Sequence, residues 1–212
     1  ILGGLSFQFF VGLLAMIGVA EMLRMKGLEF FSFEGILAML GAFVLTVPLD
    51  NYLTFLPIDS SFAAFGLVVF LLLAGTVINS GAYSFDDASF PIAASLYVGI
   101  GFHNLVTARM DGLNKVILAL FIVWATDIGA YMIGKQFGKH KLLPSVSPNK
   151  TIEGSLGGIL SAMVVGAIFM AFDKTVYAPH NFLVMLVLVA LFSVFGQFGD
   201  LVASSVKRYV GI

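Results

Sequence analysis

Three charged residues stand where a strongly apolar sequence would not ordinarily place them. Asp127 lies inside the run "LALFIVWATDIGAYMIG". At about 1.5 Å per helical residue it is roughly 9 Å from the end of that run near Ile133. Lys150 stands in "SPNKTIEGSLGG" and Asp200 in "GQFGDLVASSVKR", each at the border of another apolar run. A carboxylate at membrane depth costs a few kcal/mol. Asp127 is therefore expected to face a cavity, a metal or a neighbouring helix.

The residues around Lys150 suit the start of a helix that binds phosphate. Thr151 can cap the next helix, and Glu153 falls in its first turn. Capping leaves Lys150 unexplained, and a lysine beside the free N–H groups of a helix N-terminus can hold a phosphate. The glycines at 154, 157 and 158 allow close approach of either a ligand or a neighbouring helix, and both interpretations stay open.

The segment that begins at Asp200 combines an acid, hydroxyl groups and two bases. If the preceding apolar run continues as a helix, Ser204, Lys207 and Arg208 share a face with Asp200. Such a set suits a Mg²⁺–phosphate site, because Mg²⁺ takes carboxylate oxygens together with substrate phosphates. The alternative is a solvated helix end whose basic side chains reach the membrane surface.

The composition predicts the class of fold that positions these residues. Of the 212 residues 59% are hydrophobic and only 11% are charged, whereas a soluble domain has about 25% charged residues. We therefore expect an all-α integral membrane protein. The net charge of −1 gives no field for nucleic acid, and the absence of cysteine excludes thiolate chemistry.

The apolar runs predict about seven spanning helices, because a bilayer core needs roughly 20 apolar residues per helix. The expected spans are 1–20, 34–49, 62–79, 90–107, 113–133, 155–172 and 181–198, the second and fourth being short. We expect one polytopic domain, 1–212, with N-terminal helices in 1–112 and the candidate site in 113–212. His103 and Asn104 are expected to bond neighbouring helices.

Lysine and arginine predict the orientation, because they are enriched in cytoplasmic loops. With an outside N-terminus, the cytoplasmic segments hold eight of these residues: Arg24, Lys26, Lys135, Lys139, Lys141, Lys150, Lys207 and Arg208. The outer segments hold Arg109, Lys115 and Lys174. The 134–154 loop and the C-terminal segment are therefore expected on the cytoplasmic face, where Asp127, Lys150 and Asp200 should converge on one polar cavity open laterally to lipid.

Two ordered blocks resemble the bacterial phosphatidate cytidylyltransferases, or CDP-diacylglycerol synthases. The first block is matched by Asp127, Ala130, Tyr131, Gly134, Lys135, Gly138, Ser147, Pro148, Lys150, Thr151, Glu153 and Gly154. The second is matched by Gly199, Asp200, Leu201, Ser204, Lys207 and Arg208. Ala203 stands where the family has Glu. The sequence stops at Ile212, before a family Lys-Asp pair and glycine-rich segment, so we expect a C-terminally truncated form.

The resemblance implies a reaction and its participants. The family transfers a cytidylyl group from CTP to phosphatidic acid, giving CDP-diacylglycerol and pyrophosphate, at the cytoplasmic side of the bacterial inner membrane. It implies Asp127, Lys150 and Asp200 as catalytic residues, with Asp200 and Asp127 holding Mg²⁺ or another divalent cation. Phosphate contacts are expected from Lys135, Ser147, Lys150, Thr151, Glu153, Ser204, Lys207 and Arg208. Membrane lipid is a further expected partner, and a homodimer is left open.

Two other functions fit parts of the same pattern. A CTP-dependent polyprenol or lipid kinase would also place acids and bases at the cytoplasmic face, but its product would be CDP and not pyrophosphate. A transporter could use Asp127 as a proton or cation relay. Broken helices in symmetric halves would favour a transporter, and the sequence shows no such symmetry.

Overall fold

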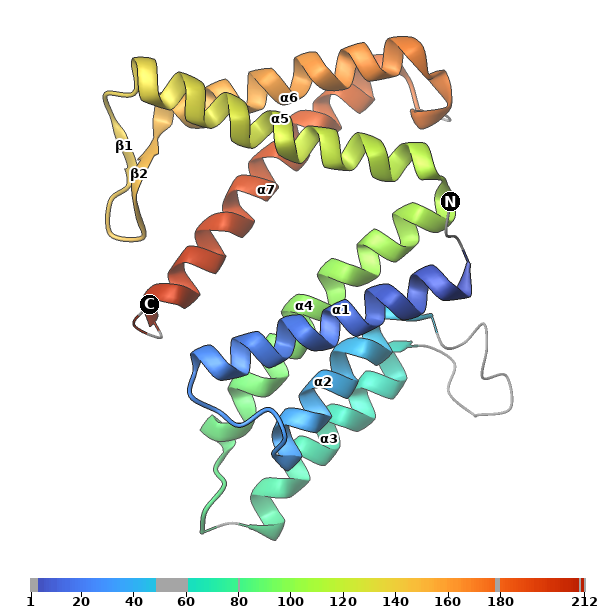
Figure 1. Cartoon of the computed structure of the whole chain (residues 1–212), viewed down its shortest axis with the longest axis vertical. Helices are drawn as coiled ribbons and strands as arrows, with labels where there is room; N and C mark the ends of the chain where they lie inside the picture. The colour runs from blue at the N-terminus through green and yellow to red at the C-terminus, as the bar shows by residue number, and fades with distance from the viewer. Residues whose placement is uncertain (1–3, 49–60, 80, 178–179, 210, 212) are drawn as a thin grey trace. The chain divides into compact units, whose positions relative to one another are not determined.

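The chain folds almost entirely into apolar helices (Figure 1). The computed structural model describes residues 4–48, 61–79, 81–177, 180–209 and 211. The helices are α1 (Leu5–Met25), α2 (Phe33–Thr46), α3 (Ser61–Ile78), α4 (Phe85–Asp111), α5 (Leu113–Phe137), α6 (Ile152–Phe172) and α7 (Phe182–Tyr209). Within the described ranges six are long and apolar enough to cross a membrane, and α2 is shorter. The prediction of an all-α membrane protein with about seven helices is confirmed.

Several expected boundaries are wrong. The fourth helix is not short, because α4 has 27 residues. The fifth does not end at 133 but continues to Phe137, and the seventh runs past Asp200 to Tyr209. Polar residues at a helix end lower the hydropathy without interrupting the backbone hydrogen bonds, so an apolar run marks the membrane core and not the helix. Residues 1–3 and 49, assigned above to the first and second spans, lie outside the described residues.

The described chain forms two compact units, Ile1–Asp111 and Gly112–Ile212. In the first unit α2 contacts α1, α3 and α4. Its core contains Ala15, Val19, Leu23, Ala38 and Ala42, and small residues in this set let α1 and α2 lie close together. Nδ1 of His103 on α4 lies 2.9 Å from the carbonyl oxygen of Leu45 at the end of α2. The interhelical role predicted for His103 is confirmed, and Asn104 is exposed.

The second unit is organised by the antiparallel pair α5 and α6, which has the most extensive contact in the chain. Glycines on α6 allow the two backbones to approach. A Cβ atom added at Gly154 would lie 2.7 Å from the carbonyl oxygen of Ala130, and one added at Gly158 would lie 2.7 Å from that of Thr126. Helix packing therefore accounts for these glycines.

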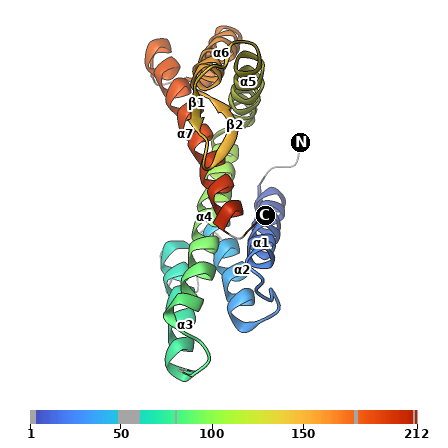
Figure 2. The same cartoon turned by 90° about the vertical axis from the view of Figure 1, so that its left-hand side faces the viewer.

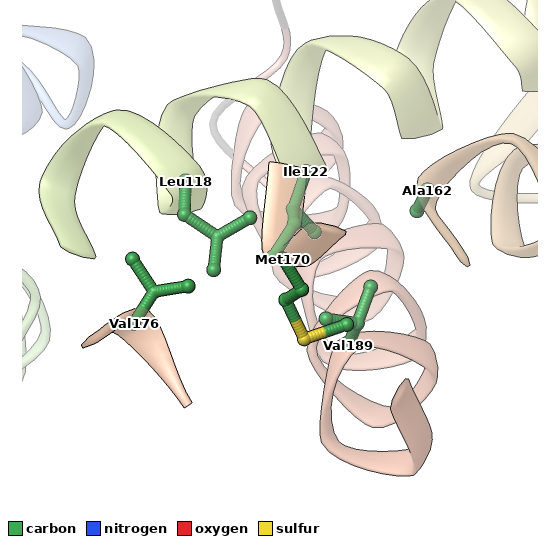
Figure 3. Packing of buried hydrophobic residues seen from close by; sticks show 6 residues of the cluster. All are labelled: Leu118, Ile122, Ala162, Met170, Val176 and Val189. Carbon is green, nitrogen blue, oxygen red and sulfur yellow. The ribbon is translucent and has the colours of Figure 1, made fainter. Parts of the chain in front are cut away.

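A cluster of buried side chains joins the α5–α6 pair to α7 (Figure 3). Its members are Leu118, Ile122, Ala162, Met170, Val176 and Val189. Val176 belongs to the short 3₁₀ helix η2 (Lys174–Val176), whose N-cap is Asp173. Asn114 at the start of α5 donates a hydrogen bond to Asp173, 2.5 Å long. The Thr175 hydroxyl, its N–H group and Asn114 together hold the pKa of Asp173 below its ordinary value.

At the other end of the pair, the expected 134–154 loop is a β-hairpin. Strands β1 (Lys141–Leu143) and β2 (Ser147–Thr151) pair antiparallel, with Lys141 opposite Thr151 and Leu143 opposite Ser147. The hairpin projects from the α5–α6 end toward the side where the C-terminal half of α7 runs (Figures 1 and 2). A two-stranded hairpin is only marginally stable alone, so it depends on the helices at its base.

The close approach of α5 and α6 gives a stability prediction. Gly158→Ala places a methyl group against a backbone carbonyl, and such overpacking typically costs about 1–3 kcal/mol. We expect a lower melting temperature in detergent. The matched control is Gly196→Ala on α7, where an added Cβ meets nothing within 4 Å. That change should leave the melting temperature unchanged or raise it, because alanine favours a helix over glycine. Equal stability of the two variants would contradict the packing argument.

Candidate functional site

A cavity of about 440 Å³ lies at the hairpin end of the second unit. Four elements form its walls: α5, the hairpin, the first turn of α6, and α7. Its lining residues are Asp127, Ala130, Tyr131, Gly134, Lys135, Leu142, Ser147, Asn149, Lys150, Thr151, Gly154, Ser155, Gln197 and Asp200. The cavity therefore combines two acids, two bases and several neutral polar groups at the end of otherwise apolar helices.

The α5 wall follows from helical periodicity. Residues 127, 130, 131, 134 and 135 are spaced by three or four and so share one face of a helix. Asp127 lies at one end of this face and Lys135 at the other. The Lys135 ammonium lies 5.6 Å from the centre of the Tyr131 ring, within the range of a cation–π contact. The same face that carries the acid therefore also supplies a base about two turns away.

The hairpin and the cap of α6 supply the second wall. Thr151 is the N-cap of α6, and its hydroxyl oxygen accepts a hydrogen bond of 3.1 Å from the Gly154 N–H. The predicted capping role of Thr151 is confirmed. Because Lys150 precedes the cap on strand β2, its position is set both by the pairing of β2 with β1 and by the start of α6. Ser147 and Asn149 reach the cavity from the same strand.

The third wall is α7, which is attached to the other elements by polar contacts. The Gln197 side-chain amide donates to the Ser155 carbonyl oxygen at 3.2 Å. One turn further on, the Asp200 carboxylate forms an ion pair with the Lys150 ammonium. Their side chains are 62% and 26% exposed. Because one partner is largely exposed, the pair contributes on the order of 1 kcal/mol, so either group can exchange its partner for a ligand with a small loss of free energy.

A smaller cleft of about 160 Å³ adjoins the cavity between α5 and α7. It is lined by Ile122, Val123, Thr126, Asp127, Phe192, Ser193, Gly196 and Asp200. Asp127 and Asp200 belong to both hollows. In the lining of this cleft the hydroxyl oxygens of Thr126 and Ser193 lie 2.8 Å apart. The Thr126 hydroxyl donates to the Ile122 carbonyl, so Ser193 is the donor of this interhelical bond. The two carboxylates thus stand at the junction of two hollows that each have both polar and apolar lining residues.

The structure brings together most of the residues that the sequence singled out. Asp127, Lys150 and Asp200 line one cavity, as the expected convergence requires, and so do Lys135, Ser147 and Thr151. Four others are not among its lining residues. The Glu153 carboxylate binds the chain before β1. Ser204, Lys207 and Arg208 lie further along α7, Ser204 half-buried and the two bases exposed. Catalytic and binding roles for all of these residues stay predictions.

Sequence reasoning missed three polar lining residues: Asn149, Ser155 and Gln197. A signal was available for two of them. Gln197 precedes Asp200 by three residues in an otherwise apolar helix, and Asn149 directly precedes Lys150. Ser155 offered no signal, because it contributes through its backbone carbonyl to Gln197 and any residue type has that group.

The donor set fits a hydrated Mg²⁺ ion that substrate phosphates help to bind. Within the described ranges no group of three or more His, Asp or Glu side chains comes together. Mg²⁺ is commonly held by one or two carboxylates together with waters and phosphates. Asp127 and Asp200, at the junction of the two hollows, are such a pair.

Comparison with known proteins relates the whole chain to enzymes of known family. The model of the cytidylyltransferase family matches residues 1–212. A phosphatidate cytidylyltransferase of Staphylococcus saprophyticus is 39% identical over 212 residues, covering 99% of this chain and 79% of that enzyme. The phosphatidate cytidylyltransferase of Staphylococcus haemolyticus is 37% identical, with 100% and 80% covered, and that of Staphylococcus aureus strain COL is 37% identical, with 99% and 79% covered. On this similarity along its whole length, the chain belongs to the cytidylyltransferase family.

Proposed function

We propose that this chain transfers the cytidylyl group of CTP to phosphatidate, forming CDP-diacylglycerol and releasing pyrophosphate. The name shared by its relatives supports this reaction. The observation that carries it is the convergence of Asp127, Lys150 and Asp200, from three separate segments, on one cavity at the end of apolar helices. A water-soluble nucleotide and a lipid phosphate can meet at such an end.

The chemistry requires alignment and charge neutralisation more than proton transfer. A phosphate oxygen of phosphatidate attacks the α-phosphorus of CTP, the new P–O bond forms, and the bond to pyrophosphate breaks. The nucleophile is already anionic, so the barrier is lowered by holding the two phosphates in line and offsetting their charge. Lys150 and Lys135 supply positive charge within the cavity. The Ile152 and Gly154 N–H groups at the start of α6 already donate to the His140 carbonyl and the Thr151 hydroxyl, so the proposed phosphate contacts come from side chains.

Asp200 and Asp127 would hold a divalent cation together with the substrate phosphates. Such an ion, when bound, offsets phosphate charge and stabilises the leaving pyrophosphate. Lys150 then has a second role, because its ammonium group balances the charge of the Asp200 carboxylate when no substrate is present. Both partners of this ion pair acquire ligands of opposite charge when phosphates and a cation enter. Because the ion pair between Lys150 and Asp200 contributes little free energy, replacing each partner by a ligand loses little stability.

The lipid acceptor suits the cleft between α5 and α7. Ile122, Val123 and Phe192 give this cleft one apolar side, and the two shared carboxylates mark where it meets the larger cavity. Acyl chains can stay against apolar helices while the headgroup phosphate reaches the nucleotide. Hydrocarbon need not enter water, which explains why the polar groups gather at one end of the unit.

We place the hairpin end on the cytoplasmic side of a bacterial cell membrane. The Lys and Arg residues of the second unit support this orientation. Those at the hairpin end or beyond it are Lys135, Lys139, Lys141, Lys150, Lys207 and Arg208, against Lys115 and Lys174 near the opposite ends of the helices. A cytoplasmic site also gives access to CTP.

The product distribution tests the proposed reaction. Full-length protein incubated with CTP labelled in the α-phosphate, phosphatidate and Mg²⁺ should give labelled CDP-diacylglycerol and one pyrophosphate per lipid product. A lipid kinase would instead release labelled CDP, and a transporter would leave the nucleotide intact. Either of these results would replace the proposed reaction.

The Asp200→Asn variant should lose turnover while remaining folded in detergent. The change keeps the shape of the side chain and removes the charge that would hold the cation. Losing a metal ligand should cost several kcal/mol of transition-state stabilisation, at about 1.36 kcal/mol per tenfold in rate. Pyrophosphate release and melting temperature are measured together, with Asp86→Asn on α4 as an exposed-acid control. A stable Asp200→Asn protein with more than about a tenth of the parent rate would remove Asp200 from the metal site.

The Lys150→Ala variant should act mainly on nucleotide phosphates. If Lys150 contacts the ground state and the transition state equally, KM for CTP rises and kcat changes little; if it contacts the developing charge, kcat falls. Lys174→Ala removes an exposed base at the other end of α6 and serves as the matched control. Unchanged kcat and KM in Lys150→Ala would show that the ion pair with Asp200 is its only role.

A further inference from the structure

The carboxylate of Glu153 closes the base of the hairpin. Glu153 lies in the first turn of α6, but its side chain reaches across to the chain that enters β1. It accepts hydrogen bonds from the backbone N–H of Lys139 at 3.1 Å and from that of His140 at 3.2 Å. Nδ1 of the His140 ring lies 2.6 Å from its other oxygen. Three donors from two adjacent residues therefore converge on one carboxylate.

The backbone completes the same closure. The Ile152 N–H donates to the His140 carbonyl oxygen at 2.9 Å, next to the paired residues Lys141 and Thr151. The segment between His140 and Ile152 is thus tied at both ends. It carries five cavity residues: Leu142, Ser147, Asn149, Lys150 and Thr151. The contacts that close the hairpin at residues 140 and 152 therefore also hold one wall of the cavity in position.

Ordinary helix-start chemistry does not explain this arrangement. In a capping box the acid lies three residues after the cap and bonds back to the N–H of the cap residue. Glu153 is two residues after Thr151, and its bonds go to residues 139 and 140. Glu34 provides a direct comparison. It follows the Ser32 cap of α2 in the sequence "SFEG", as Glu153 follows Thr151 in "TIEG", and both caps accept from the glycine N–H.

We infer that Glu153 is a positioning residue that acts through the hairpin, fixing Lys150 opposite Asp200. Charge-assisted bonds to backbone N–H groups are about twice as strong as neutral ones and are directional. Two such bonds, together with the contact to the His140 ring, restrict the movement of the hairpin relative to α6. A carboxylate so engaged is not available to bind substrate phosphate, and its negative charge would repel one.

His140 contributes a hydrogen-bond donor to this contact. A carboxylate only accepts, so Nδ1 of His140 must carry hydrogen, as it does in one neutral tautomer and in the imidazolium form. Asparagine offers an amide N–H that can serve as a comparable donor. His140→Asn should therefore preserve the contact that His140→Ala removes. This pair separates the hydrogen bond from the ring itself.

Cleavage of the hairpin by trypsin tests the inference independently of activity. Lys139, Lys141 and Lys150 offer cleavage sites in or beside it. The folded full-length protein is digested without substrate as wild type, Glu153→Gln, His140→Ala, His140→Asn and the control Glu34→Gln. In Glu153→Gln one amide oxygen faces three donors, so we expect hairpin cleavage to accelerate about tenfold or more. His140→Ala should show a smaller acceleration, His140→Asn should restore slow cleavage, and Glu34→Gln should behave as wild type.

Kinetics with CTP provide the second readout, which rests on the proposed function. Misplacing a catalytic group by about 1 Å can cost up to a hundredfold in rate, so kcat/KM should fall ten- to a hundredfold in Glu153→Gln and be rescued in His140→Asn relative to His140→Ala. Reduced kcat/KM with unchanged cleavage would assign Glu153 to the substrate instead. Faster cleavage with unchanged kinetics would show that hairpin position does not matter.

Either an effect of Glu34→Gln equal to that of Glu153→Gln or a failure of His140→Asn to rescue would overturn the inference. If Glu153→Gln does not fold, the two His140 variants decide alone. A wild-type protein that does not turn over CTP would refute the proposed function, while the cleavage comparison would still test whether Glu153 holds the hairpin in place.

Discussion

The contact between α5 and α6 is the constraint on which the site depends. Helices in lipid gain little from hiding apolar surface, so their association relies on close packing and polar contacts. Here α6 presents glycine where α5 presents its backbone, and a methyl group at Gly154 or Gly158 would meet a carbonyl oxygen at 2.7 Å. Such close fitting fixes how far α6 lies along α5. That register decides whether Asp127 on one helix faces the capped start of the other.

Polar contacts fix the position of α7, whereas glycines fix the positions of α5 and α6 relative to each other. The buried residues of α7 are Val189, Ser193 and Leu201, few for so long a helix. Three of its polar contacts follow one face, at 193, 197 and 200. Ser193 bonds to Thr126 on α5, Gln197 to the Ser155 carbonyl on α6, and Asp200 to Lys150 on the hairpin. Each contact reaches a different element, so this face orients α7 toward the three other elements that line the cavity.

The sequence predicted the parts of this arrangement that depend on local chemistry. Hydrophobic runs located the helices, Thr151 identified the cap of α6, and Asp127, Lys150 and Asp200 were singled out because acids and bases are rare in apolar sequence. What it could not predict depends on pairing across space. The hairpin has short strands, one containing Pro148, and no alternating pattern. Glu153 looked like a residue serving its own helix, because nothing local indicates that its partners are at 139 and 140.

Charge balance links the cavity walls to the proposed reaction. The lining residues contribute two carboxylates, Asp127 and Asp200, and two ammonium groups, Lys135 and Lys150. A cavity so balanced has no net attraction for a triphosphate and a lipid phosphate, which together bring several negative charges. If the carboxylates hold a divalent cation, as proposed, the ion adds the positive charge that the side chains lack and releases Lys150 from Asp200. Nucleotide affinity should then depend on the cation even before any bond is broken. An arrangement of lysines alone would bind phosphate without that dependence.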